Sequence, residues 1–236
     1  MLKPSSTAPP SAARLQAATA MSTMTQPSPE RRTERRHFSM IRGFHLADFF
    51  TLGNAACGTA AVFFAMLYMA QGQVAQFYAS AALMIAALVF DVLDGRIARW
   101  RQQNSSLGRE LDSLADVISF GLGPAALAFA AGMQGGWDVA ILLYFVCCGV
   151  SRLARYNVTA ESMSGADAKV KYFEGTPIPT SVFLALVLAF CAWQGRVGDG
   201  LYFGSWDLGW QLHPMALLFA LSGTLMISKT LHIPKL

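Results

Sequence analysis

Charged residues are scarce in this 236-residue chain, where they make up 14% of the sequence against roughly 25% in soluble domains. Hydrophobic residues account for 54%. This composition excludes an ordinary soluble globular protein. The chain is therefore predicted to be an integral membrane protein.

Several common site signatures are also missing. The four cysteines show no CxxC spacing and the four histidines form no metal-binding pair, so neither a disulfide framework nor a zinc site is indicated. There is no GxxxxGK[ST] loop and no GxGxxG segment after a strand, so a phosphate would have to be held by metal and arginine. No nucleic-acid partner is expected.

What the sequence does contain is a series of apolar runs. A membrane span takes about 20 residues, and several of the runs reach that length only with their flanks. In the fourth run the apolar part is short, so Arg152 and Arg155 would lie on a helical extension beyond the lipid. We predict an all-α integral membrane protein whose six transmembrane helices include residues 47–70, 74–89, 114–133, 139–150, 178–193 and 212–227.

The basic residues predict the orientation of these helices. If the N-terminus is cytoplasmic, all of the 18 basic residues except Arg196 lie in cytoplasmic segments. The positive-inside rule favours this arrangement, which places both termini in the cytoplasm.

The first forty residues differ from the rest. They are rich in Pro, Ser, Thr and Ala and contain the run ERRTERR at 30–36, so residues 1–40 are predicted to form a disordered basic leader. An organellar transit peptide is the alternative interpretation. Residues 41–236 would form the membrane domain, and the segment 37–50 could lie in the membrane interface as a short amphipathic stretch.

Four aspartates interrupt the apolar pattern. Asp91 and Asp94 are spaced i, i+3, and Asp112 and Asp116 are spaced i, i+4, so each pair projects from one helical face. Two adjacent helices could direct all four carboxylates to one point, where divalent cations would relieve their repulsion. Such oxygen ligands suit magnesium, manganese or calcium better than zinc. The spacing predicts a one- or two-metal site at the cytoplasmic edge of the membrane.

The aspartates belong to a longer pattern, Asp91-x2-Asp94-Gly95-x2-Ala98-Arg99-x8-Gly108-x3-Asp112-x3-Asp116. At every fixed position this segment resembles the signature of the CDP-alcohol phosphotransferase family. Members are integral membrane enzymes that transfer a substituted phosphate from a CDP-linked donor to an alcohol and release CMP. The resemblance implies a six-helix core from near Phe44 onward, a two-metal site and a homodimer.

The resemblance also implies roles for single residues. Asp91, Asp94 and Asp112 would be the main metal ligands, and Asp116 would touch a metal and act as the base that removes the alcohol proton. Arg99 suits a phosphate through its fixed fork of donors. The residues expected at the CDP-linked donor are Gly95, Ala98, Arg99, Ser105 and Gly108.

Some of these residues have simpler explanations. Gly95, Ala98 and Gly108 could be small residues that let helices pack closely, which is their commonest role in membranes. Thr51 and Asn54, in the first helix, could contact the donor or could hydrogen-bond to a neighbouring helix. The sequence leaves both possibilities open.

The acceptor alcohol depends on the second cytoplasmic loop. Segments 151–157 and 173–180, together with 51–58, resemble those of the serine-using members of the family, the phosphatidylserine synthases. This resemblance implies CDP-diacylglycerol and L-serine as substrates, with magnesium or manganese. An amino acid needs a cation for its carboxylate and an anion for its ammonium group, and the loop supplies Arg152, Arg155 and Glu174. The two arginines could instead hold the lipid phosphate.

Two other functions stay open. The acceptor could be glycerol 3-phosphate, inositol or choline. A six-helix ion or metal transporter is the alternative from another class, although its charges should line a path through the bilayer rather than gather at one edge. We expect the chain in a bacterial cytoplasmic membrane, with its site facing the cytoplasm.

Overall fold

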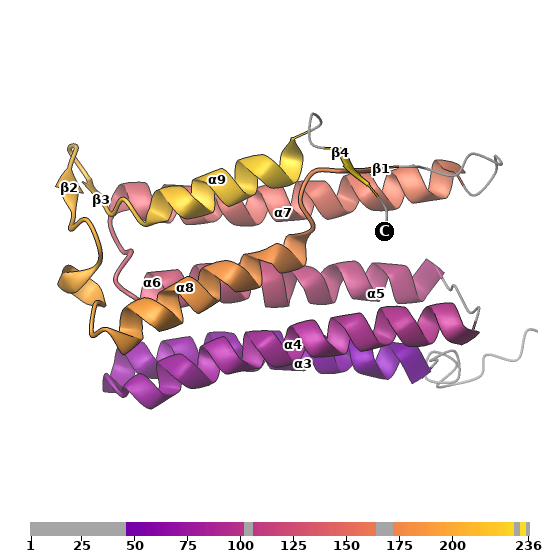
Figure 1. The fold of residues 1–236 in the computed structure, drawn as a ribbon, viewed down its shortest axis with the longest axis horizontal. Helices are drawn as coiled ribbons and strands as arrows, with labels where there is room; N and C mark the ends of the chain where they lie inside the picture. Colours follow the sequence, from indigo (N-terminus) through magenta and orange to yellow (C-terminus); the bar gives the residue numbers. More distant parts are fainter. Residues whose placement is uncertain (1–45, 102–105, 164–171, 229–231, 235–236) are drawn as a thin grey trace, which may run out of the picture. The chain divides into compact units, whose positions relative to one another are not determined.

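The described part of the chain is mostly helical. A computed structural model describes residues 46–101, 106–163, 172–228 and 232–234, all within the unit that begins at Gly43. The predicted leader, residues 1–40, lies outside the described residues. With the labels of Figure 1, the α-helices are α3 (Leu46–Gln71), α4 (Val74–Arg101), α5 (Ser106–Asp116), α6 (Gly123–Ala130), α7 (Gly136–Met163), α8 (Val182–Trp193) and α9 (Ala216–Ile227).

Short elements connect these helices. A π-helical turn, η1 (Val117–Leu122), joins α5 to α6, and a 3₁₀ turn, η2 (Ile178–Ser181), leads into α8. Another 3₁₀ turn, η3 (Gly198–Gly200), follows α8. Two small antiparallel sheets pair β1 (Tyr172–Glu174) with β4 (His232–Pro234) and β2 (Trp206–Asp207) with β3 (Gln211–Leu212).

Each of the six predicted apolar runs is helical over most of its length. Among the described residues, the stretches long and apolar enough to cross a membrane are Asp48–Gln71, Val74–Ile97, Leu107–Ala130 and Gly136–Thr159. The apolar helices Ile178–Trp193 and Ala216–Ile227 are shorter. The helical membrane class therefore agrees with the sequence, while the count of six spans and the cytoplasmic placement of both termini stay predictions.

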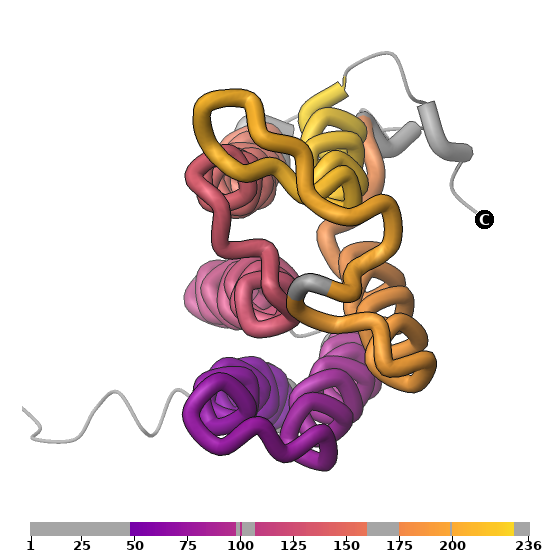
Figure 2. Tube along the Cα trace, turned by 90° about the vertical axis from the view of Figure 1, so that its left-hand side faces the viewer, coloured from indigo at the N-terminus to yellow at the C-terminus, as the bar shows by residue number. Residues whose placement is uncertain are grey.

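The helices pack mainly in two pairs, α3 with α4 and α7 with α9, and both pairs contact the span formed by α5, η1 and α6. α3 lies along α4 and also contacts α5, η1 and α6, whereas α7 packs along α9 (Figure 2). The rings of Phe145 and Phe219 meet edge to face, 5.3 Å apart, between α7 and α9. The beginning of α3, the end of α4 and the beginning of α5 lie at the same end of the bundle, on the right in Figure 1. Polar residues from these three helices can therefore meet there.

Gly58 lets α3 approach the third span very closely. A Cβ atom at this position would lie 2.6 Å from Cα of Ser119, a distance that real Cβ atoms essentially never show. Ser119 is fully buried and its Oγ donates a 2.9 Å hydrogen bond to the backbone oxygen of Asn54. The close packing thus fixes α3 against the π-helical turn η1.

α7 continues well past its apolar part. It runs for 28 residues without a break, so Arg152 and Arg155 lie on the same helix as the membrane-spanning residues. Both arginines are therefore helical, as predicted, while their position beyond the lipid stays a prediction.

Candidate active site

Two neighbouring spans bring carboxylates together. Asp91 on α4 and Asp112 and Asp116 on α5 each offer an oxygen, and these three atoms lie within 4.8 Å of one another. Asp91 and Asp112 are half-buried, whereas Asp116 is buried. The helical spacing of the aspartates therefore does direct side chains from two helices to one point.

The fourth aspartate is held by α3. Asp94 is buried, and its Oδ2 accepts a 2.8 Å hydrogen bond from Oγ1 of Thr51. It lies close enough to Asp91 and Asp112 for the negative charges to repel. Asp94 thus borders the three-carboxylate group, and the Thr51 hydroxyl fixes the orientation of its carboxylate.

A second residue of α3 reaches the same cluster. Nδ2 of Asn54 donates a 3.3 Å hydrogen bond to Oδ1 of Asp116. Asn54 is fully buried, and its own Oδ1 has no hydrogen-bond partner among the described residues. Thr51 and Asn54 therefore form interhelical hydrogen bonds, as one of the two alternatives predicted, and their partners are carboxylates of the predicted site.

The backbone changes its winding directly after Asp116. The π-helical turn η1 begins at Val117, and such turns are frequent at functional sites. Oγ of Ser181, in η2, donates a 2.5 Å hydrogen bond to the backbone oxygen of Phe120. Gly121 lies within the π turn, and Gly123 and Pro124 follow it directly at the start of α6.

The cluster fits a divalent cation. Within the described part of the chain, none of the four carboxylates forms a salt bridge with Lys or Arg. Oδ1 of Asp112 is buried and has no described hydrogen-bond partner. A carboxylate oxygen in that position is a suitable ligand for a hard cation such as magnesium, manganese or calcium.

Open space lies beside Gly95. A Cβ atom added there would meet no described atom within 4 Å, so no described helix uses this glycine for close packing. Gly95 follows Asp94 directly, and a ligand could approach the α4 backbone at this point.

The other predicted donor residues are placed only in part. Gly108 lies in α5 and is half-buried. Ala98 and Arg99 lie in the last turns of α4 and Glu174 ends β1, but the side chains of these three residues lie outside the described set. Ser105 also lies outside the described residues.

The two arginines of α7 differ in their surroundings. The Arg152 side chain is partly buried, its Nε has no described partner, and its charge is attracted by Asp116. Arg155, three residues further on, is exposed. Arg152 is thus the arginine that the fold brings toward the carboxylates.

Sequence reasoning missed a polar contact between α7 and α5. Asn157 is buried, and its Nδ2 donates hydrogen bonds to Oγ of Ser113 at 3.0 Å and to Oε1 of Glu110 at 3.3 Å. The available signal was its spacing: Asn157 follows the buried Leu153 by four residues, and so continues the buried face of the helix.

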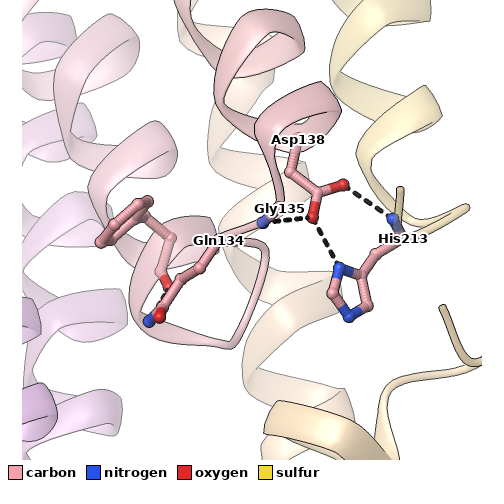
Figure 3. A network of polar contacts seen from close by, with 5 residues as sticks. Gln134, Gly135, Asp138 and His213 are labelled. Carbon is pink, nitrogen blue, oxygen red and sulfur yellow. Dashed lines mark hydrogen bonds and ion pairs between the residues drawn. The ribbon is translucent and has the colours of Figure 1, made fainter. Parts of the chain in front are cut away.

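A second missed contact lies at the other end of α7 (Figure 3). Asp138 is fully buried; its Oδ1 accepts a 2.7 Å hydrogen bond from the His213 backbone N–H, and its Oδ2 lies 2.6 Å from Nδ1 of the same residue. Oδ2 also accepts a 3.0 Å hydrogen bond from the Gly135 N–H. This pair connects the start of α7 to the segment before α9, at the end of α7 opposite to Arg152.

Comparison with known proteins identifies the family. A family model described as CDP-alcohol phosphatidyltransferase matches residues 44–222. Since the match covers most of the chain, the chain belongs to this family, and the resemblance carried by the aspartate pattern is confirmed. It is an enzyme of the CDP-alcohol phosphotransferase class.

Several curated relatives within the family share one name. The CDP-diacylglycerol–serine O-phosphatidyltransferase of Saccharomyces cerevisiae is 42% identical over 207 residues, which cover 86% of this chain and 75% of the yeast protein. The enzyme of the same name from Mycobacterium leprae is 38% identical over 133 residues, or 55% of this chain and 43% of that protein. The one from Bacillus subtilis is 30% identical over 142 residues, covering 59% and 72%.

Proposed function

We propose that this protein transfers the phosphatidyl group of CDP-diacylglycerol to L-serine and so produces phosphatidylserine and CMP. The observation that supports this most directly is the meeting of Asp91, Asp112 and Asp116 within 4.8 Å, in a chain of the CDP-alcohol phosphatidyltransferase family. The choice of serine follows from the names of the relatives, which specify serine as the acceptor.

Two divalent cations, magnesium or manganese, are proposed for the carboxylate cluster. Asp91, Asp94 and Asp112 would hold them. Oδ1 of Asp112, which has no hydrogen-bond partner among the described residues, and the hydrogen-bonded orientation of Asp94 suit this role. When bound, such cations neutralise charge on the diphosphate and on the leaving CMP. The Thr51 hydroxyl, which donates to Asp94, would orient this carboxylate in the way that hydrogen-bond partners of metal ligands usually do.

Asp116 is proposed as the general base. The serine hydroxyl oxygen forms a bond to the phosphorus of the phosphatidyl group, and the bond from that phosphorus to the CMP oxygen breaks. The bonding electrons leave with CMP, and the hydroxyl proton passes to Asp116. Because Asn54 holds Oδ1 of Asp116, the other carboxylate oxygen would receive the proton.

The donor would lie along the end of α4. Open space beside Gly95 lets a nucleotide approach the backbone next to Asp94. We propose that Ala98 leaves similar room and that Arg99, Ser105 and Gly108 complete the donor site, as the family pattern implies. The acyl chains would stay in the lipid.

The acceptor would lie between the carboxylates and α7. Arg152 is partly buried, its Nε has no hydrogen-bond partner in the described part of the chain, and Asp116 attracts its charge. Its guanidinium can therefore receive an anionic group of a substrate. That group is either the serine carboxylate or the lipid phosphate. Arg155 and Glu174 are proposed as further polar contacts to the same substrate.

The placement in the cell is also a proposal. We propose six spans in a bacterial inner membrane, with both termini and the active site on its cytoplasmic face. Residues 1–40 would form a basic leader that precedes the first span. The density of basic residues on that side supports this orientation. The homodimer expected from the family resemblance stays a prediction, to be checked by cross-linking in the membrane.

An acceptor panel tests the reaction. Purified full-length protein in mixed micelles would be given CDP-diacylglycerol with L-serine, glycerol 3-phosphate, inositol or choline, and CMP release and the lipid product would be measured. We expect release with serine only, loss of release after chelation, and recovery with magnesium or manganese. Asp116→Asn should be inactive, while Asp207→Asn, in an exposed strand, should match wild type. Release with another alcohol and none with serine would contradict the proposal.

A further inference from the structure

The cytoplasmic end of α7 is tied to α5 beside the metal ligands. Asn157 is buried and donates from Nδ2 to Ser113 and Glu110, and Oγ of Ser113 lies 3.3 Å from Oδ1 of Asn157. Ser113 is the neighbour of Asp112 in the chain. The amide thus joins α7 to the turn of α5 that presents a carboxylate to the cluster.

The same helix presents Arg152 to the site. Arg152 and Asn157 are five residues apart on an uninterrupted helix, a rise of about 7.5 Å along the axis. Over so short a distance a helix behaves as a rigid body. A hydrogen bond that fixes the rotation and the axial position of α7 at Asn157 therefore also fixes where the guanidinium of Arg152 lies relative to Asp116.

The side chain of Arg152, unlike that of Asn157, is not held by a described hydrogen bond at its Nε. This nitrogen is buried and has no hydrogen-bond partner among the described residues. Its position then depends on the helix that carries it, which makes the attachment of that helix important for substrate binding.

We propose that Asn157 is a positioning residue, which sets the distance between Arg152 and the carboxylate cluster by hydrogen-bonding α7 to Glu110 and Ser113 of α5. The inference rests on the proposed function, because Arg152 is taken to bind an anionic group of a substrate. Asn157 does not contact the reacting atoms in this account. Its loss should weaken the binding of the substrate that Arg152 holds, without removing the chemistry.

The test compares substrate-specific KM values. KM for L-serine and KM for CDP-diacylglycerol would be measured separately for wild type, Arg152→Ala and Asn157→Ala. Arg152→Ala identifies which substrate the arginine holds. Asn157→Ala should raise KM for that same substrate by about 3- to 10-fold, the range expected from losing one or two hydrogen bonds, with kcat changed less. No change in either KM, or a change confined to the other substrate, would overturn the inference.

Glu110 supplies a second, milder test in case Asn157→Ala does not fold. Glu110→Gln keeps an acceptor oxygen for Nδ2 of Asn157, whereas Glu110→Ala removes it. Both variants lose the charge, so the difference between them reports the loss of the accepting side chain and not the loss of the charge. We expect a near wild-type KM in Glu110→Gln and a raised KM in Glu110→Ala. Equal KM values in the two variants would count against the role of Asn157.

Tyr144→Phe is the matched control. It removes a 3.2 Å contact between Tyr144 Oη and Thr224 Oγ1 that also joins α7 to another helix, but to α9 and not to α5. Both KM values should stay at the wild-type level. Failure of the proposed function would show in wild type, as no CMP release with serine; KM would then be measured for whichever alcohol does release CMP. Failure of the present inference would show only in the variants.

Discussion

Asn54 and Asp116 are 62 positions apart in the sequence, and their side chains meet at 3.3 Å in the interior of the bundle. The amide of α3 donates to the carboxylate that we propose as the base. Both residues are buried, so the contact is shielded from water and from competing hydrogen bonds. The orientation of Asp116 therefore depends on a helix that carries no proposed metal ligand.

Replacing Asn54 by Ala should lower kcat. The hydrogen bond to a charged acceptor is worth about 1.5–3 kcal/mol, so turnover should fall about 10-fold or more, while KM for both substrates changes less. Steady-state kinetics with each substrate in turn would measure this. A normal kcat in Asn54→Ala would show that Asp116 does not need this partner.

Replacing Thr51 by Val should weaken metal binding. The 2.8 Å hydrogen bond to Asp94 would be lost while the shape of the side chain is kept, and loss of such an outer partner typically costs about 10-fold in metal affinity. The magnesium or manganese concentration for half-maximal activity reports the effect. Thr51→Ser keeps the hydroxyl and should stay near wild type, so a shift of equal size in both variants would contradict the assignment.

The proposed ligands and the proposed base should behave differently. Asp91→Asn should raise the half-maximal metal concentration by at least about 10-fold, because a ligand is lost and not merely its outer partner. Asp116→Asn should reduce turnover by about 100-fold or more and retain more binding of CDP-diacylglycerol than of activity. Binding of the labelled donor lipid and single-turnover rates separate the two effects. Equal losses of binding and turnover at Asp116 would remove its role as base.

Replacement of two glycines by alanine should affect the stability of the protein differently. Gly58→Ala places a Cβ against the backbone of Ser119, so it should destabilise the protein by about 1–3 kcal/mol and lower its Tm. Gly95→Ala meets no described atom, so its Tm should match wild type. If the donor uses the space beside Gly95, KM for CDP-diacylglycerol should rise in that variant. A normal KM would place the nucleotide elsewhere.

The sequence predicted the helices and the aspartate pairs, because both depend on local spacing. Asp91 and Asp112 could be assigned to helical faces from the 3.6-residue repeat alone. Which polar side chain meets which depends on how neighbouring helices are rotated and shifted, and no local pattern specifies that. The bonds from Asn54 to Asp116 and from Asn157 to Glu110 therefore required the structure.

Local sequence patterns do not predict the π turn after Asp116 either. The sequence places Gly121 and Gly123 at this point, but glycine permits a kink, a bulge or close packing equally well. The winding that is observed accompanies long-range contacts, namely Ser119 with the Asn54 backbone and Ser181 with the Phe120 backbone. The two residues of each pair are more than sixty positions apart in the sequence.

The order of residues along the chain has a consequence for biosynthesis. The four aspartates, together with Thr51 and Asn54, all come from α3, α4 and α5. A ribosome has therefore made the entire carboxylate cluster and its hydrogen-bond donors before it reaches Arg152 on α7. Cation capture can precede the arrival of the helix that we assign to the acceptor, so the nascent protein could acquire its metal before it can turn over substrate.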